Sequence, residues 1–368
     1  MRSCRAGLLC LAVFLFAGVN VAALAADAAS ADAKPHDYRD RNFDYFVSGD
    51  PRLPRAARTE GGVVLFGGGG RVDAGFRYIA KRAGGGHIVI LRAVSDDSYD
   101  PTDGDYGESF AKDWGPVVSA ETIVFHNRDA SSDPRVVEAL KNADGIFLAG
   151  GDQANYIRYW KGTPVQEALN AHVRVHRPIG GSSAGLAVLG RYAYTAFDGG
   201  SMESRVALAD PFDAGMTLER DFLHCPGLER VITDTHFSAR SRLGRLIAFI
   251  ARIHHDDAAA NLYGIGVDEA SALLVDDKGV GRLAAGSKGN AWVVEEPAAK
   301  GTRIEPGHAL TVDVRITRVD AGSVVDAGKG TVAHPGEVAD MAIRDGVSDA
   351  KGRLLAMLLR SVTPPDED

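Results

Sequence analysis

Short apolar runs alternate along the chain with segments of helical spacing, and several of the runs end at glycines. The strand-like runs cover residues 63–66, 87–91, 121–125 and 145–149, and the helical segments cover 74–81, 136–141 and 164–176. A further strand-like stretch starts at Pro178. Apolar strands separated by helices are typical of a parallel sheet covered on both faces. The pattern therefore predicts an α/β fold, and ligands of such sheets bind at the carboxyl ends of the strands.

The pattern changes in the last quarter of the chain. Residues 291–294 and 310–316 alternate between apolar and polar, which predicts antiparallel strands that extend or flank the parallel sheet. Helical spacing returns over residues 340–361, with leucines on one side. We therefore expect an α/β domain over residues 60–327 with a C-terminal β-rich extension, followed by a helical tail over residues 328–368.

The N-terminal region differs in composition from the rest. Two arginines precede an apolar run from Leu8 to Phe16, and residues 23–25 read Ala-Leu-Ala. This order is typical of a cleaved secretory signal peptide over residues 1–25, and the run is too short for a membrane span. We expect a secreted or periplasmic protein without stable membrane insertion after cleavage; an uncleaved anchor is the alternative. Residues 26–59 predict a leader or linker, with one docked segment around 43–46.

The composition narrows the class of partner and the source of stability. The net charge is −8, and removal of residues 1–25 takes away two arginines and no acid, which leaves −10. An acidic chain argues against nucleic acid as a partner and suits a cationic substrate. Cys4 and Cys10 leave with the signal peptide, so Cys225 remains alone and no internal disulfide can form. The exported chain must then be stabilised by its hydrophobic core.

The strongest chemical signal is the run Gly181-Ser182-Ser183-Ala184-Gly185, which matches G-x-S-x-G. A strand-like stretch precedes it and apolar helix-like residues follow, which is the context of a nucleophile on a sharp strand-to-helix turn. Glycines flank such a serine because a β-carbon would collide with neighbouring strands. The amides that begin the next helix suit an oxyanion. The register of the glycines favours Ser183 over Ser182 as nucleophile; a packing turn is the alternative without function.

Two more motifs follow predicted strands. The glycines at 150–151 let backbone amides approach a ligand, and Gln153 can hold a substrate amide or carboxylate. A plain turn with Asp152 as a helix cap explains the same residues equally well. His236 follows the strand-like run 231–233, where a neutral imidazole can take the proton of a serine hydroxyl.

Arginines and acids complete the constellation. Arg240, Arg242 and Arg245 can bind a carboxylate through two hydrogen bonds, or they form an ion-paired or solvated helix face. Asp268 and Glu269 end another apolar run. A carboxylate there can orient the imidazolium of a catalytic triad, whereas the alternatives are a helix cap and a buried ion pair.

In this order, the motifs resemble those of cyanophycinase and the related aspartyl dipeptidase E group of serine peptidases. They are Phe147–Gln153, Gly180–Gly185, His236-Phe237-Ser238 with the three arginines, and Gly264–Glu269. The resemblance runs from about Val63 to Asp326. It implies a flavodoxin-like parallel sheet, similar to class I glutamine amidotransferases, with helices on both faces.

The resemblance also implies an activity. It is that of a serine-type exopeptidase that hydrolyses cyanophycin, a poly-aspartate with arginine on each side chain, to β-aspartyl-arginine through an acyl-enzyme. An aspartyl dipeptidase and a catalytically silent periplasmic binding relative are the alternatives. The partner would be a peptide or polymer that bears aspartyl and arginine groups. No metal or other cofactor is implied, and a homodimer is compatible with the family.

Carried over residue by residue, the resemblance implies roles for individual side chains. Ser183 would be the nucleophile and His236 its general base. The backbone amides of Gly151 and Ala184 would form the oxyanion hole, and Gln153, Arg240 and Arg242 would bind substrate. The family usually has threonine where Ser182 stands.

The acid of the triad stays open. Glu269 is the first choice because it lies at a strand end after His236, and Asp198 and Glu203 are the rivals. With Glu269 the order along the chain is Ser, His, acid, whereas α/β-hydrolases have Ser, acid, His.

Overall fold

The centre of the molecule is a parallel sheet, as the apolar runs predict. The computed structural model describes residues 37–94, 105–258, 260–296 and 301–349. Five strands are parallel in the spatial order β5-β4-β6-β7-β3. They are β3 (Gly62–Phe66), β4 (His87–Ala93), β5 (Ser119–Phe125), β6 (Gly145–Leu148) and β7 (Pro178–Ser182). The predicted α/β fold is therefore confirmed.

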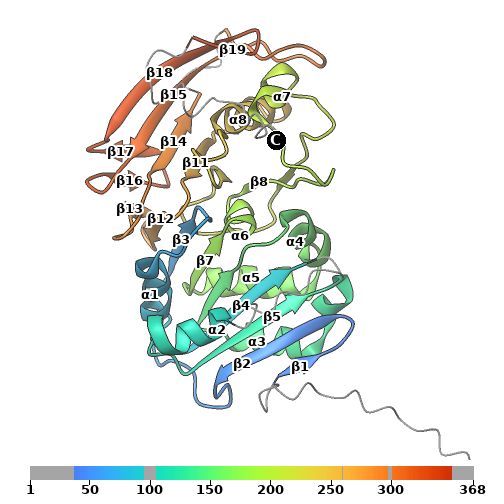
Figure 1. Ribbon diagram of the computed structural model, residues 1–368, viewed down its shortest axis with the longest axis vertical. Coiled ribbons are helices and arrows are strands. Elements are labelled where there is room, and N and C mark those ends of the chain that lie inside the picture. Colours follow the sequence, from blue (N-terminus) through green and yellow to red (C-terminus); the bar gives the residue numbers. More distant parts are fainter. Residues whose placement is uncertain (1–36, 95–104, 259, 297–300, 350–368) are drawn as a thin grey trace, which may run out of the picture. The chain divides into compact units, whose positions relative to one another are not determined.

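Successive residues of a strand point to opposite faces of the sheet. Because the residues of these strands are apolar on both faces, helices cover both faces. Val64 and Phe66 face one cluster of helices, and Val63 and Leu65 face the other. The first cluster is α1 (Asp73–Arg82), α2 (Asp105–Ser109) and the π-helical turn η1 (Phe110–Trp114); the second is the 3₁₀ turn η2 (Arg128–Ser132), α3 (Pro134–Asn142), α4 (Gln153–Trp160) and α5 (Pro164–Arg174) (Figure 1). Among the helices of the described ranges, none is long and apolar enough to cross a membrane.

Antiparallel strands extend both edges, so that the sheet has eleven strands. At one edge, β2 (Phe43–Gly49) pairs with β5 and carries β1 (Tyr38–Arg39). At the other edge follow β12 (Ala272–Asp276), β13 (Val280–Leu283), β16 (Val324–Asp326) and β17 (Thr331–Ala333). The predicted docked segment at 43–46 is thus a sheet strand. The predicted domain limits at 60 and 327 are too narrow, because β2 and β17 belong to the same sheet.

A second sheet has eight strands in the order β19-β18-β15-β14-β11-β10-β8-β9. They are β8 (Tyr192–Tyr194), β9 (Leu218–Arg220), β10 (Val231–Asp234), β11 (Tyr263–Val267), β14 (Ala291–Glu295), β15 (Val312–Val319), β18 (Glu337–Arg344) and β19 (Val347–Ser348). The predicted antiparallel strands at 291–294 and 310–316 are β14 and β15. Helices α7 (Ser204–Ala209) and α8 (Leu243–Asp256) pack on one face of this sheet, and Ile265 and Val267 on its other face join the core of the first.

The predicted C-terminal helix is wrong for the residues that the structure describes. β18 pairs with β15, and Met341 and Ile343 alternate into the core with the period of a strand. Asp345 and Gly346, with φ of 48° and 76°, then turn the chain into β19. Asp-Gly is a preferred pair for such a two-residue hairpin. The leucines that suggested a helix lie beyond residue 349, and the predicted signal peptide covers residues 1–25. Both segments lie outside the described residues.

Candidate active site

Ser183 lies on a sharp turn between β7 and the short helix α6 (Ala184–Ala187). Its φ of 53° and ψ of −117° are a conformation that non-glycine residues rarely adopt. A β-carbon at Gly181 would collide with the carbonyl oxygen of Gly185, and one at Gly185 would collide with that of Leu148. The flanking glycines are thus required by close backbone packing, as the sequence predicts. Because α6 has only four residues, stabilisation of an oxyanion at this turn would come from individual backbone amides rather than from a helix dipole.

Three side chains form a hydrogen-bonded line at the junction of the two sheets, and we call them the triad. The Ser183 hydroxyl lies 2.8 Å from Nε2 of His236, which follows β10. Nδ1 of His236 lies 2.6 Å from Oε1 of Glu269, which follows β11. Ser183 follows a strand of the first sheet, whereas His236 and Glu269 follow strands of the second. The structure therefore brings together the serine, the histidine and the first of the three candidate acids.

The surroundings of His236 favour its neutral form. The residue is 6% exposed, and burial lowers the pKa of its imidazole below the ordinary value of 6.5. The charges of Arg240 and Arg242 lower this pKa further, while Glu269 opposes them. A neutral imidazole that is oriented by a carboxylate can accept a proton from a serine hydroxyl at neutral pH.

A pocket of about 200 Å³ opens beside Ser183. Its walls are residues 151–153, 199–201 and 235–236 with Ser183, Ala196, Arg240 and Arg242. A β-carbon at Gly150 would lie 3.7 Å from that of Ser183, so the turn after β6 lies against the nucleophile. The Ala184 amide starts α6 and has no acceptor within the helix. Gln153 lines the pocket and donates to the carbonyl of Tyr194 at 3.3 Å.

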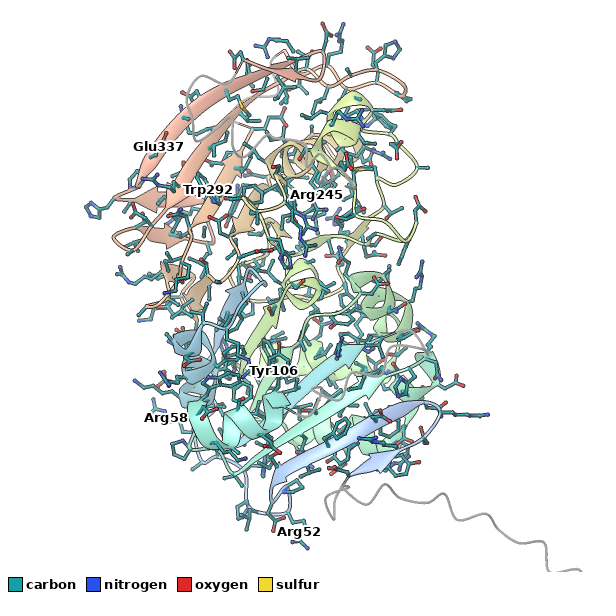
Figure 2. The ribbon with its side chains drawn as sticks, in the orientation of Figure 1. Arg52, Arg58, Tyr106, Arg245, Trp292 and Glu337 are labelled. Atoms are coloured by element: carbon teal, nitrogen blue, oxygen red, sulfur yellow. The ribbon has the colours of Figure 1, made fainter. Side chains whose placement is uncertain are left out.

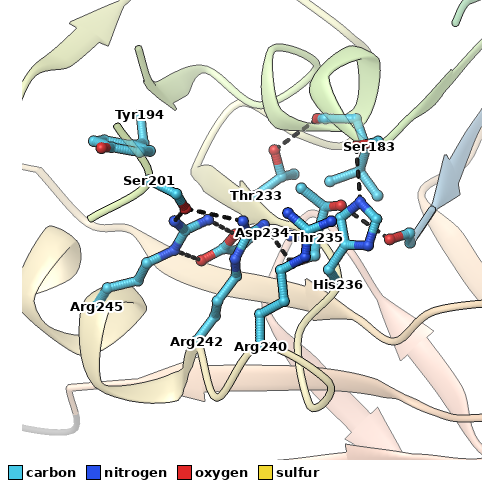
Figure 3. A network of polar contacts seen from close by, with 12 residues as sticks. Ser183, Tyr194, Ser201, Thr233, Asp234, Thr235, His236, Arg240, Arg242 and Arg245 are labelled. Carbon is cyan, nitrogen blue, oxygen red and sulfur yellow. Dashed lines mark hydrogen bonds and ion pairs between the residues drawn. The ribbon is translucent and has the colours of Figure 1, made fainter. Parts of the chain in front are cut away.

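The three arginines differ in their surroundings (Figure 3). Arg240 is half-exposed at the pocket wall, and its Nε lies 4.0 Å from Oε1 of Glu269. Arg242 is buried and donates to the carbonyl of Thr235 at 2.8 Å and to the hydroxyl of Ser201 at 3.0 Å. Burial and the charge of Arg245 lower the pKa of Arg242 to about 9, so its guanidinium stays charged at neutral pH. A desolvated cation at the pocket wall suits a substrate carboxylate.

Arg245 is a structural residue rather than a pocket residue. It lies in the interior (Figure 2). Its guanidinium forms two hydrogen bonds with Asp234, at 2.8 and 2.5 Å (Figure 3). It also donates to the Ser201 hydroxyl at 2.8 Å, the same oxygen that Arg242 contacts. Asp234 and Ser201 therefore fix the position of both buried guanidinium groups.

Replacing Asp234 by alanine is expected to destabilise the protein by about 3–5 kcal/mol, because it leaves a buried guanidinium without its counterion. Urea unfolding measures the change. The matched control is Asp256→Ala, which removes the exposed partner of Arg252 at 2.8 Å and should cost less than about 1 kcal/mol. Equal losses in the two variants would contradict a structural role of the buried pair.

The rival acids lie in a separate pocket. Asp198 and Glu203 line it together with Asp213, and within the described ranges neither has a hydrogen bond or ion pair with His236. No group of three or more His, Cys, Asp or Glu side chains in this described part could hold a metal ion.

Two contributors to the site were missed at the sequence level. Ser201 stands in a glycine-containing loop with no local signal of its contacts. The glycines after β3 are a signal that could have been used, because a β-carbon at Gly68 or Gly69 would collide with triad side chains and ligands bind at strand ends.

The sequence that carries the triad is similar to known peptidases. Residues 102–283 match the family described as Peptidase family S51. The cyanophycinase of Nostoc sp. is 31% identical over 160 residues, which are 43% of this chain and 48% of that protein. That of Geminocystis herdmanii is 26% identical over 193 residues, 52% of this chain and 64% of that protein. A solved peptidase from an acI-B1 actinobacterium has a TM-score of 0.47 at 15% identity, over 73% of this chain and 98% of its own.

Proposed function

We propose that the protein is an exported serine exopeptidase that hydrolyses cyanophycin to β-aspartyl-arginine, because residues 102–283 match peptidase family S51. The observation that carries the proposal is the hydrogen-bonded triad at the wall of a pocket that arginines line. Curated relatives named cyanophycinase support the choice of substrate, although the chain spans only 48% and 64% of the two compared above.

The proposed mechanism uses the triad in two steps. The Ser183 oxygen attacks the scissile carbonyl while Nε2 of His236 takes the hydroxyl proton, and Glu269 stabilises the imidazolium that forms. The amides of Gly151 and Ala184 stabilise the oxyanion of the tetrahedral intermediate. His236 then gives its proton to the leaving amine, which leaves an acyl-enzyme. A water molecule, deprotonated by the same imidazole, hydrolyses the ester and frees the serine.

The pocket supports both parts of the substrate proposal. Its volume of about 200 Å³ is below the about 300–1,000 Å³ of pockets that enclose a drug-sized ligand, so it suits the end of a chain. Arg240 and Arg242 offer positive charge to an aspartyl carboxylate, and Gln153 offers an amide. The carboxylate of Asp152 lies in the same wall and offers negative charge to a guanidinium.

Product analysis tests the proposal directly. Purified protein is incubated with cyanophycin, and separately with short peptides that have an N-terminal aspartate, and the products are identified by mass spectrometry. We expect release of β-aspartyl-arginine from the polymer and none from the Ser183→Ala variant. Cleavage of the aspartyl peptides without release from cyanophycin would assign the protein as an aspartyl dipeptidase.

The pH dependence of kcat/KM should show an acid limb with its midpoint below pH 6.5. Only the neutral imidazole of His236 can take the serine proton, and burial lowers its pKa below that ordinary value. Activity should therefore rise with pH through this lowered pKa, which kcat/KM reports for the free enzyme. Arg240→Gln should move the midpoint upward, because it removes a charge that lowers this pKa. A midpoint above 6.5 in the unaltered protein would contradict a His236 pKa lowered by burial, and a midpoint that does not move in Arg240→Gln would contradict the assignment of the limb to His236.

We propose that residues 1–25 direct export and are then removed. The supporting pattern is the apolar run from Leu8 to Phe16 that ends in Ala23-Leu24-Ala25. N-terminal sequencing of protein expressed from the full chain in a Gram-negative host should give a mature form that starts at Ala26. An intact N-terminus in the membrane fraction would favour the uncleaved anchor.

A further inference from the structure

The end of β3 contacts all three segments that carry the triad. Three consecutive carbonyl groups of this strand end each accept a hydrogen bond from the backbone of one segment. The bonds join the amide of Ser183 to the carbonyl of Phe66 at 3.3 Å, that of His236 to Gly67 at 2.8 Å, and that of Ala270, next to Glu269, to Gly68 at 2.8 Å. This short stretch of backbone therefore fixes the positions of the ends of β7, β10 and β11 relative to one another at the site.

The three donating residues share a positive φ, which is unusual for residues other than glycine. Ser183, His236 and Ala270 have φ of 53°, 48° and 50°, all in the left-handed region. Residues with a β-carbon hold this conformation only where the surrounding structure fixes it. The hydrogen bonds to the end of β3 are a common external contact of all three turns.

The glycines of this strand end also lie directly under the triad side chains. A β-carbon at Gly68, where φ is 83°, would lie 2.5 Å from Nε2 of His236 and 3.2 Å from the β-carbon of Ser183. These atoms flank the hydrogen bond between the two residues. At Gly69, where φ is 65°, it would lie 2.6 Å from the carboxyl carbon of Glu269. Any side chain at either position must displace a member of the triad.

We propose that residues 66–69 are the template that aligns the triad, and that Gly68 is a positioning residue for the bond between Ser183 and His236. This inference rests on the proposed function, because it assigns a role within the same triad. It adds a segment that lies outside residues 102–283, the part of the chain that matches the family. The template acts through the triad.

The decisive variant is Gly68→Ala, and its matched control is Gly286→Ala. Gly286 has φ of 85° and open space around its α-carbon, so the control carries the backbone strain without the collision. The readout is the rate at which a fluorophosphonate probe labels Ser183, a step in which the serine oxygen displaces fluoride from phosphorus and His236 takes the proton. We expect Gly68→Ala to slow labelling by about 100-fold or more, with melting temperatures alike in the two variants. Labelling at the wild-type rate, or an equal loss in both, would overturn the proposal.

This readout separates the inference from the proposed substrate, because labelling requires no cleavage of cyanophycin. A second variant, Gly69→Ala, covers the case in which Gly68→Ala does not fold or the wild type is not labelled. It should displace Glu269 and so lower the pKa of His236, which Glu269 raises and which the charges of Arg240 and Arg242 lower. NMR titration of the His236 ring measures this pKa without any activity. A folded Gly69→Ala protein whose His236 titrates as in the wild type would overturn the proposal.

Discussion

Alanine at position 183 is expected to lower kcat for hydrolysis by about 10⁶-fold, because nucleophile and base act as one unit. The change removes one hydroxyl, which is hydrogen-bonded to Nε2 of His236. The turn itself is held by backbone contacts, so the melting temperature should change little. Steady-state kinetics with the substrate found by product analysis, together with thermal unfolding, measures both effects.

Ser182→Ala is the matched control for this prediction. Ser182 is the last residue of β7 and pairs with Phe66 across the sheet, whereas Ser183 is the serine within reach of His236. We expect its kcat to stay within about tenfold of the wild type, since it lies next to but outside the triad. Loss of activity in Ser182→Ala with full activity in Ser183→Ala would reverse the assignment. A wild type that binds cyanophycin without cleaving it would instead be the silent binding relative.

The second large effect is expected from Glu269→Gln, which should lower kcat by about 10³-fold. The neutral amide of glutamine can donate a hydrogen bond to Nδ1 of His236. The imidazole then carries its proton on Nε2, and in this tautomer Nε2 cannot accept the proton of Ser183. In a well-buried triad this error costs about 10⁴-fold. We expect a smaller loss here because the side chain of Glu269 is 37% exposed.

The rival acids serve as controls for Glu269. Asp198→Asn and Glu203→Gln change carboxylates that line the neighbouring pocket and are not hydrogen-bonded to His236 in the described ranges. Each should leave kcat within a few-fold of the wild type, and an effect on KM is compatible with their place beside Gly200 and Ser201. A loss in either control as large as that in Glu269→Gln would contradict the geometry of the triad.

The sequence predicted those parts of the fold and site whose signals are local. The parallel strands are apolar at nearly every position because both faces are covered, and this pattern survives in a single sequence. The sequence alone could place Ser183 on a sharp turn, because such a turn needs glycines on both sides. The close backbone packing at Gly181 and Gly185 explains this need. The sequence predicted a docked segment at 43–46, but its pairing with β5 as a strand is a finding of the structure.

The remaining features depend on contacts between distant segments. Spacing along the chain gives no distance from His236 to Glu269, Asp198 or Glu203, so the sequence alone leaves the acid open. Arg245 had the same pattern as Arg240 and Arg242, and only its buried contact with Asp234 separates it from the pocket residues. Leucines further along the chain extend a helical spacing back to residue 340, which led to the wrong prediction of a helix. The residues around Met341 alternate with period two, as a strand requires, and they form β18.

The division of the triad between two sheets has a consequence for the protein before it is folded. Ser183 follows a strand of the first sheet, while His236 and Glu269 follow strands of the second, and the core joins the two. An unfolded chain has Ser183 but no base beside it. We therefore expect catalytic activity to appear only when the two sheets have docked, which requires long-range contacts. During unfolding, loss of activity should report the first separation of the sheets even while most helices persist.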